Sequence, residues 1–142
     1  MERWMRAIAV MATVVLGACN ADESTVPPPT EASVVGTYAL RIVNGGNLPF
    51  PYSATSSTRL DIIGGSLTVT ADHTFSDALV FRTTDLTTNT AADPETQTLT
   101  GTWALSGSSL ELTYAGPHTL VAVVTGKEIT RVDQGLSLTY RK

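Results

Sequence analysis

The sequence predicts an all-β domain, a small antiparallel meander barrel of about eight strands. Three observations indicate this class. Threonine, valine and aromatic residues alternate with polar residues over short runs, which is the pattern of strands with one buried face. Glycine with asparagine or aspartate separates these runs, as is typical of tight turns. No segment shows the apolar spacing of an amphipathic helix.

The expected strands follow one another along the chain with short turns between them. The first ends at the turn Asn44-Gly45-Gly46, and Gly64-Gly65 separates two apolar runs as a turn or a bulge. Asp77 interrupts the apolar alternation of its run, which indicates that the first residues of that strand lie at a rim. In order, the apolar runs are 38–42, 60–62, 67–69, 75–81, 99–105, 110–114, 119–124, 128–132 and 136–140.

Two of the connections are typical of hairpins. Ser106-Gly107-Ser108 reverses the chain after the run 99–105, and Thr125-Gly126-Lys127 joins the two runs that follow 114. In the first hairpin, Trp103 is expected to pack in the core with Leu99 and Leu105, which share its face of the strand.

A meander of this kind can close on itself. Closure requires the first strand, around 38–42, to pair with the last, around 136–140, because only that pairing leaves no free edge. Alternation alone also fits an open sandwich of two sheets, which stays the alternative.

The chain begins with the features of an export signal. Arg3 and Arg6 precede ten residues, 7–16, that carry no charge. A helix needs about 20 apolar residues to span a bilayer, so this run is too short for a stable transmembrane anchor. Residues 1–18 are therefore expected to be a cleaved signal peptide.

The end of this signal resembles the lipobox of bacterial lipoproteins. The motif is Leu16-Gly17-Ala18-Cys19, and Cys19 is the only cysteine of the chain. The resemblance implies that the Cys19 sulfur accepts a diacylglycerol and that the mature chain is anchored to a membrane of the bacterial cell envelope. Asn20 is not the aspartate that favours inner-membrane retention in these lipoproteins, which implies the outer membrane.

Composition divides the mature chain into a tether and one domain. Residues 19–33 contain the acylated cysteine and the run Pro27-Pro28-Pro29, which favours an extended path. Residues 34–142 have the size of a single domain. Removing the signal changes the formal charge of −4 to about −5, so the composition gives no reason to expect a nucleic-acid partner.

The domain resembles the lipocalin-like barrel families. The resemblance rests on Gly36-Thr37-Tyr38 in the first strand, on the meander, and on Arg141 after the last strand. In these families a Gly-x-Trp motif packs beneath a C-terminal arginine, which implies that Arg141 approaches Tyr38. This chain has Tyr38 in place of the tryptophan, and its Trp occurs in Gly101-Thr102-Trp103.

Residues with catalytic or metal-binding chemistry are sparse. The two histidines, His73 and His118, are too few for a typical zinc or copper site once Cys19 is acylated. No Gly-x-Ser-x-Gly motif occurs, and the Gly-Ser pairs fall where turns need small residues. We expect neither an enzyme nor a bound cofactor or metal.

Two functions remain open for the domain. In the first, it binds a small apolar ligand, because an eight-stranded barrel either fills with side chains or holds one small molecule. The loop after the first strand, through Phe50 and Tyr52, fits a structural lid that plugs the core, and the alternative is a lid that gates the ligand. In the second, the core is filled and the loop from Asp85 to Glu95 contacts another envelope protein. The candidate ligand-binding residues are Phe50, Tyr52, Phe75, Phe81, Trp103 and Tyr114.

Overall fold

In the computed structural model, the described residues are 26–116 and 118–142. They form one short helix, α1 (Glu31–Val34), and eleven strands in a single sheet. The strands are β1 (Gly36–Val43), β2 (Gly46–Asn47), β3 (Phe50–Ala54), β4 (Thr58–Val69), β5 (Thr74–Asp85), β6 (Thr90–Ala91), β7 (Glu95–Ser106), β8 (Ser109–Tyr114), β9 (Thr119–Thr125), β10 (Glu128–Asp133) and β11 (Leu136–Arg141).

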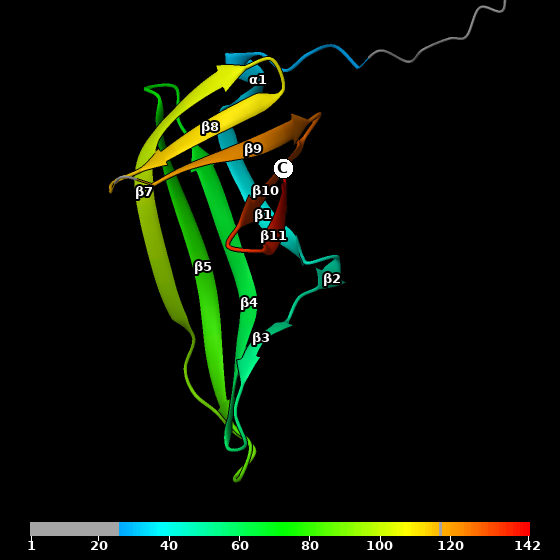
Figure 1. The fold of residues 1–142 in the computed structure, drawn as a ribbon, viewed down its shortest axis with the longest axis vertical. Helices are drawn as coiled ribbons and strands as arrows, with labels where there is room; N and C mark the ends of the chain where they lie inside the picture. Colours follow the sequence, from blue (N-terminus) through cyan, green and yellow to red (C-terminus); the bar gives the residue numbers. More distant parts are fainter. Residues whose placement is uncertain (1–25, 117) are drawn as a thin grey trace, which may run out of the picture.

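Eight of these strands close into an antiparallel barrel. The order is β1, β4, β5, β7, β8, β9, β10 and β11, and β11 returns to β1 (Figure 1). Leu40 of β1 lies opposite Tyr140 of β11, while Tyr38 lies opposite Leu67 of β4. The predicted closed meander and the predicted pairing of its first and last strands are therefore confirmed, and the two-sheet sandwich is wrong.

Inward-facing apolar residues fill the half of the barrel next to α1. In β8, Leu110, Leu112 and Tyr114 are buried while their neighbours are exposed, which is the alternation of a strand with one wet face. Strand β1 shows the same alternation of buried and exposed side chains, and its Tyr38 is completely buried. Its hydroxyl donates a 2.7 Å hydrogen bond to the carbonyl of Val34, so α1 covers this end of the core.

The expected contact between Arg141 and Tyr38 is wrong by one residue. Arg141 points outward and its Nε lies 2.6 Å from a carboxylate oxygen of Glu128. Lys142 faces Tyr38 instead, with Nζ 4.8 Å from the ring centroid and within hydrogen-bond distance of the carbonyls of Ser33 and Val35. The reason is alternation: Tyr140 points into the barrel, so the next residue must point out.

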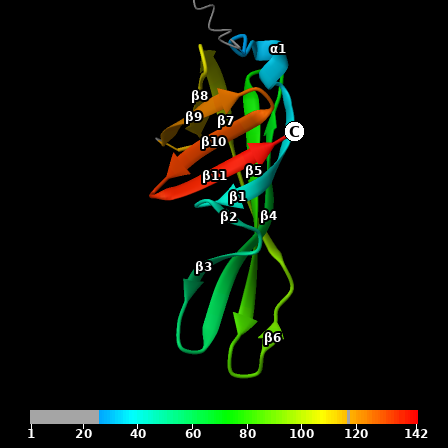
Figure 2. The same cartoon turned by 90° about the vertical axis from the view of Figure 1, so that its right-hand side faces the viewer.

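Part of the sheet extends well beyond the barrel. We call this part the arm; it consists of β3, β6, residues 58–63 of β4, 80–85 of β5 and 95–99 of β7. Figure 2 shows it projecting from the end of the barrel opposite α1. It begins at a bulge between Ile62 and Gly64, which confirms the bulge as one of the two readings of Gly64-Gly65.

Three local expectations need correction. Asp77 does not mark a rim; only 2% of it is exposed, because it forms an ion pair inside the barrel. Leu99 is 58% exposed rather than packed with Trp103, because β8 pairs with β7 only from Gly101 onward. The end of the expected extended tether is helical, since Thr30 caps α1 through the backbone N–H of Ser33.

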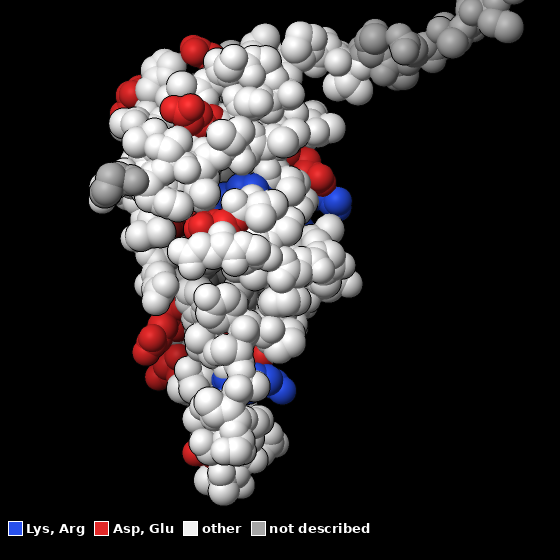
Figure 3. Space-filling model, in the orientation of Figure 1, with Lys and Arg blue, Asp and Glu red and all other residues white. Residues whose placement is uncertain are grey.

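The predictions on export and anchoring concern residues outside the described part. The signal peptide, the lipobox and Cys19 all fall within 1–25. Within 26–116 and 118–142, no helix is long and apolar enough to cross a membrane. On the face shown in Figure 3, basic side chains lie scattered and form no patch.

Candidate ligand-binding site

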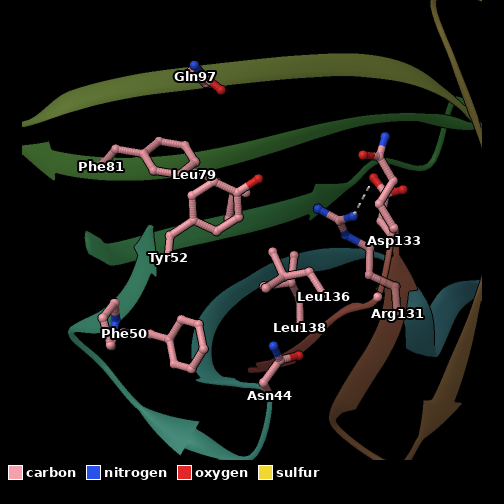
Figure 4. Close-up of a pocket in the computed structure, with 13 residues that line it drawn as sticks. Asn44, Phe50, Tyr52, Leu79, Phe81, Gln97, Arg131, Asp133, Leu136 and Leu138 are labelled. Atoms are coloured by element: carbon pink, nitrogen blue, oxygen red, sulfur yellow. Dashed lines mark ion pairs between the residues drawn. The ribbon is translucent and has the colours of Figure 1, made fainter. Parts of the chain in front are cut away.

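A pocket of about 460 Å³ opens at the end of the barrel from which the arm projects. The arm forms one wall and the β10–β11 hairpin forms the other, as Figure 4 shows. Most of the side chains on the two walls are apolar or aromatic, and most of the polar ones gather on the hairpin side. The lining residues are Asn44, Phe50, Pro51, Tyr52, Leu79, Phe81, Gln97, Arg131, Asp133, Gln134, Gly135, Leu136 and Leu138.

Strand β5 supplies the centre of the arm wall. Asp77, Leu79 and Phe81 share the face that continues the barrel interior, because side chains two apart point the same way. Tyr52 of β3 packs edge-on against Phe81, with 6.0 Å between the ring centroids. Tyr52 is half exposed, so its ring forms the rim of the pocket.

The turn of the β10–β11 hairpin and a contact with the end of β1 position the hairpin wall of the pocket. Gln134 and Gly135 form the turn with positive φ angles of 47° and 83°, and it presents Asp133 and Leu136 to the pocket. The side-chain oxygen of Asn44 accepts a 2.7 Å hydrogen bond from the backbone N–H of Ser137. This bond fixes the β1–β2 turn against β11 and closes that corner of the pocket.

A buried polar cluster lies behind the hairpin wall. Nη2 of Arg131 lies 2.5 Å from Oδ2 of Asp77, and Arg131 is only 4% exposed. The hydroxyls of Tyr114 and Tyr140 donate to the Asp77 carboxylate over 3.1 and 3.0 Å. Burial raises the pKa of both tyrosines far above the ordinary 10.0, so both remain hydrogen-bond donors at neutral pH.

Arg131 and Asp133 leave polar groups free at the pocket. Nη1 of Arg131 lies 3.8 Å from Oδ2 of Asp133, which is too far for a hydrogen bond. Among the hydrogen bonds of the described residues, none uses Nη1 of Arg131 or the side chain of Gln97. The other oxygen of Asp133 lies 3.5 Å from Nε2 of His118. The pocket can therefore both donate and accept hydrogen bonds.

The six residues predicted from the sequence divide into two groups. Phe50, Tyr52 and Phe81 line the pocket. Phe75, Trp103 and Tyr114 lie instead in the packed barrel core. Phe75 packs edge-on against Tyr114 at 4.9 Å, and Trp103 Nε1 donates a 2.9 Å hydrogen bond to the carbonyl of Thr70.

Sequence reasoning missed the polar residues of the pocket. Arg131 and Asp133 occupy the same face of β10 as the buried Ile129, just as Asp77 occupies the inward face of β5. Opposite charges at inward positions of two strands are a signal of a buried ion pair, and reading the two strands together would have found it. Nothing in the run 95–98 marks Gln97, because every residue there is polar and exposed.

The histidines do not form a metal site. His73 stacks on Trp103 with 4.6 Å between the ring centroids, while Nε2 of His118 lies 3.5 Å from Oδ1 of Asp133. In the described part of the chain, no group of three or more His, Cys, Asp or Glu residues is arranged to hold a metal ion.

Comparison with known proteins shows little similarity. No protein-family model matches the sequence, and no curated protein matches it. A matching solved structure is the crystal structure of the Cpx pathway activator NlpE from Escherichia coli, with 20% sequence identity and a TM-score of 0.38. The match covers 68% of this chain and 42% of that chain, so it spans less than half of the length of NlpE.

Proposed function

We propose that this chain is a non-catalytic, lipid-anchored protein of the bacterial cell envelope whose barrel mouth binds a small, largely apolar molecule. The observation that carries the proposal is the pocket between the arm and the β10–β11 hairpin. Its volume of about 460 Å³ lies within the range of roughly 300–1,000 Å³ that is typical of small-molecule sites. Its walls combine aromatic and aliphatic side chains with several polar ones, and such sites also combine the two kinds.

The location of the pocket fits a tethered protein. Helix α1, which lies at the N-terminal end of the described chain, covers one end of the barrel (Figure 1). The pocket opens at the other end. The pocket therefore opens away from the end of the domain through which the membrane anchor is attached. A ligand would enter from the aqueous side, which suits a carrier or a sensor.

The anchor itself can be tested in cells. Metabolic labelling with a clickable fatty acid should label the wild-type protein, and Cys19→Ser should abolish the label, because that sulfur is the acyl acceptor. Fractionation of the same cells should recover the labelled protein with the outer membrane. A wild-type protein that takes up no label would contradict the anchoring.

Ligand binding can be tested with an apolar fluorescent probe. The probe is N-phenyl-1-naphthylamine, titrated into the mature chain carrying Cys19→Ser, so that no acyl chains compete. Tyr52→Ala should weaken binding about fivefold, because half of this ring already lies in solvent and its loss is worth about 1 kcal/mol. Val121→Ala is the control, since Val121 is exposed on β9 outside the pocket. Absence of binding, or equal effects of the two substitutions, would overturn the proposal.

A second candidate function, a protein-interaction module, is favoured by the edge of the arm. Residues 95–100 of β7 are all exposed, and β8 does not begin to pair with β7 until Gly101. A strand edge of this kind can take up an extended segment of another protein. A photo-crosslinking residue at Thr96 should then capture an envelope protein in cells, whereas the same residue at Glu111 on β8 should not.

A further inference from the structure

Two charged groups in the wall of the pocket form an ion pair with no hydrogen bond between them. Nη1 of Arg131 and Oδ2 of Asp133 are separated by 3.8 Å, and both belong to residues that line the pocket (Figure 4). Arg131 is 4% exposed and held rigidly, because its Nη2 is bonded to Asp77 and lies 3.3 Å from the hydroxyl of Tyr140. A fixed donor beside an acceptor to which it makes no hydrogen bond is a geometry that recognises a ligand group able both to accept and to donate.

The charges around this pair disfavour an anionic ligand. The positive charge of Arg131 is already matched by the buried carboxylate of Asp77, which accepts hydrogen bonds from Tyr114 and Tyr140 as well. Asp133 adds a second carboxylate at the pocket wall, and its Oδ1 lies 3.5 Å from Nε2 of His118. A carboxylate ligand would be repelled by Asp133, while the charge of Arg131 is already matched by Asp77.

A cationic ligand is less well suited than a neutral one. Its charge would be attracted to Asp133, but it would lie beside the guanidinium of Arg131, which donates hydrogen bonds and accepts none. An uncharged group that accepts from Arg131 and donates to Asp133 satisfies both residues at once. A hydroxyl or a primary carboxamide has this pairing of donor and acceptor.

Resting on the proposed ligand-binding function, we propose that the pocket selects uncharged amphiphiles with a hydroxyl or carboxamide head group. The head group bridges Nη1 of Arg131 and Oδ2 of Asp133 from the pocket side. The apolar body lies against the arm, over the rings of Phe50, Tyr52 and Phe81. Gln97, on the arm wall, offers a further amide to a second polar substituent.

Displacement of N-phenyl-1-naphthylamine tests this selectivity on the mature chain carrying Cys19→Ser. The competitors are decan-1-ol, its methyl ether and decanoate. The ether accepts a hydrogen bond but cannot donate one, and it is more apolar than the alcohol, so simple partition into an apolar site would favour it. We expect the alcohol to displace the probe at a concentration at least fivefold lower than the ether, and decanoate to be the weakest of the three.

A matched pair of variants distinguishes recognition of the head group by Asp133 from simple partition of the competitors into an apolar site. Asp133→Ala should remove the preference for the alcohol over the ether and should strengthen decanoate binding, because it removes the acceptor and its charge. Glu111→Ala removes a carboxylate from the exposed face of β8 and should leave the wild-type order unchanged.

The possible results distinguish the two proposals. If the probe binds the wild-type chain and the ether or decanoate displaces it as well as the alcohol does, the head-group selectivity is wrong while ligand binding stands. If the probe does not bind at all, the proposed function itself fails. Should Asp133→Ala not fold, the wild-type order of the three competitors still decides the selectivity.

Discussion

The ion pair of Asp77 and Arg131 takes a place in the barrel where apolar side chains would otherwise pack. Both side chains are at least 96% buried, and Nε of Arg131 has no hydrogen-bond partner in the described part of the chain. Taking two charges out of water is costly, and a buried pair often adds no net stability over apolar residues of similar size. We infer that the pair is kept for its role behind the pocket, where it orients Nη1 of Arg131.

Removing one member of this pair should be severely destabilising. We expect Asp77→Ala to lower the free energy of unfolding by about 3–5 kcal/mol, because it leaves a buried guanidinium without its counter-ion. Replacing both residues, as Asp77→Leu with Arg131→Met, should restore much of that loss. Urea denaturation measures the free energy of unfolding of the wild type, of Asp77→Ala and of the double variant. A single variant as stable as the wild type would show that Arg131 is not buried as described.

Lys142 should be energetically coupled to Tyr38. Its Nζ lies 4.8 Å from the ring centroid, and a cation over an aromatic ring at an exposed site contributes roughly 0.5–1 kcal/mol. A double-mutant cycle with Tyr38→Phe is unsuitable because the ring remains, so Tyr38→Leu is combined with Lys142→Ala. The same cycle with Arg141→Ala should give additive losses. Coupling to Arg141 in place of Lys142 would contradict the contact described above.

Two single-residue expectations from the sequence are wrong, each for its own physical reason. The resemblance to lipocalin-like barrels indicated a C-terminal cation over the first strand, which is present, but placed it on Arg141. Alternation from the buried Tyr140 would have assigned Lys142, since residues two apart share a face. Asp77 was assigned to a rim because its neutralising partner, Arg131, lies 54 residues away in sequence.

At the scale of the elements, the turns and the inward-facing strands could be predicted and the arm could not. The hairpin turns at Ser106-Gly107-Ser108 and Thr125-Gly126-Lys127 both occur as expected. The arm segments 83–85 and 95–98 are almost entirely polar and exposed, so they carry no apolar alternation to read. They are strands because they pair with neighbouring strands, which a single segment does not reveal.

The crossing of β7 from the arm into the barrel depends on a glycine. A Cβ atom at Gly101 would overlap the carbonyl oxygen of Thr113 and would lie 2.8 Å from a ring carbon of Phe75. We expect Gly101→Ala to lower the free energy of unfolding by about 1–3 kcal/mol, because backbone must shift to make room. Gly64→Ala in β4 is the control, since its Cβ would meet nothing closer than 4.0 Å. Equal thermal midpoints for the two variants would contradict this account.

For the molecule as a whole, the buried tyrosines should make the fold sensitive to alkali. Burial raises the pKa of Tyr38, Tyr114 and Tyr140 above the ordinary 10.0. Above pH 10 the unfolded chain therefore loses protons that the folded chain keeps, and stability falls as the pH rises. The slope is up to about 1.4 kcal/mol per pH unit for each tyrosine.

One group acts in the opposite direction. Burial lowers the pKa of Lys142, so its contribution to stability rises as it deprotonates, but three tyrosines outweigh one lysine. Urea denaturation at a series of alkaline pH values measures the slope, and tyrosinate absorbance reports the ionisation. Tyr140→Phe should flatten the slope. A stability that is constant above pH 10 would show that these rings are solvated.

The closed barrel was predictable from the sequence as a whole, whereas the pocket was only partly so. Closure follows from the number and order of the apolar runs. The pocket depends on the arm, which extends the barrel wall on one side only. It also depends on charged residues whose partners can be assigned only when the pairing of the strands is known. Phe50, Tyr52 and Phe81 are conspicuous in the sequence as aromatic residues and line the pocket, whereas no pattern within a single strand singles out Arg131 and Asp133, which line it too.

The most direct test of the proposed function maps where a ligand binds. Two-dimensional amide NMR spectra of the isotope-labelled mature chain carrying Cys19→Ser are recorded with and without decan-1-ol. We expect the signals that shift to belong to the strands around the pocket, residues 50–52, 79–81, 97 and 131–138. Shifts centred on the exposed face of β9 at Val121 and Val123, or no shifts at saturating alcohol, would contradict a ligand site at the mouth of the barrel.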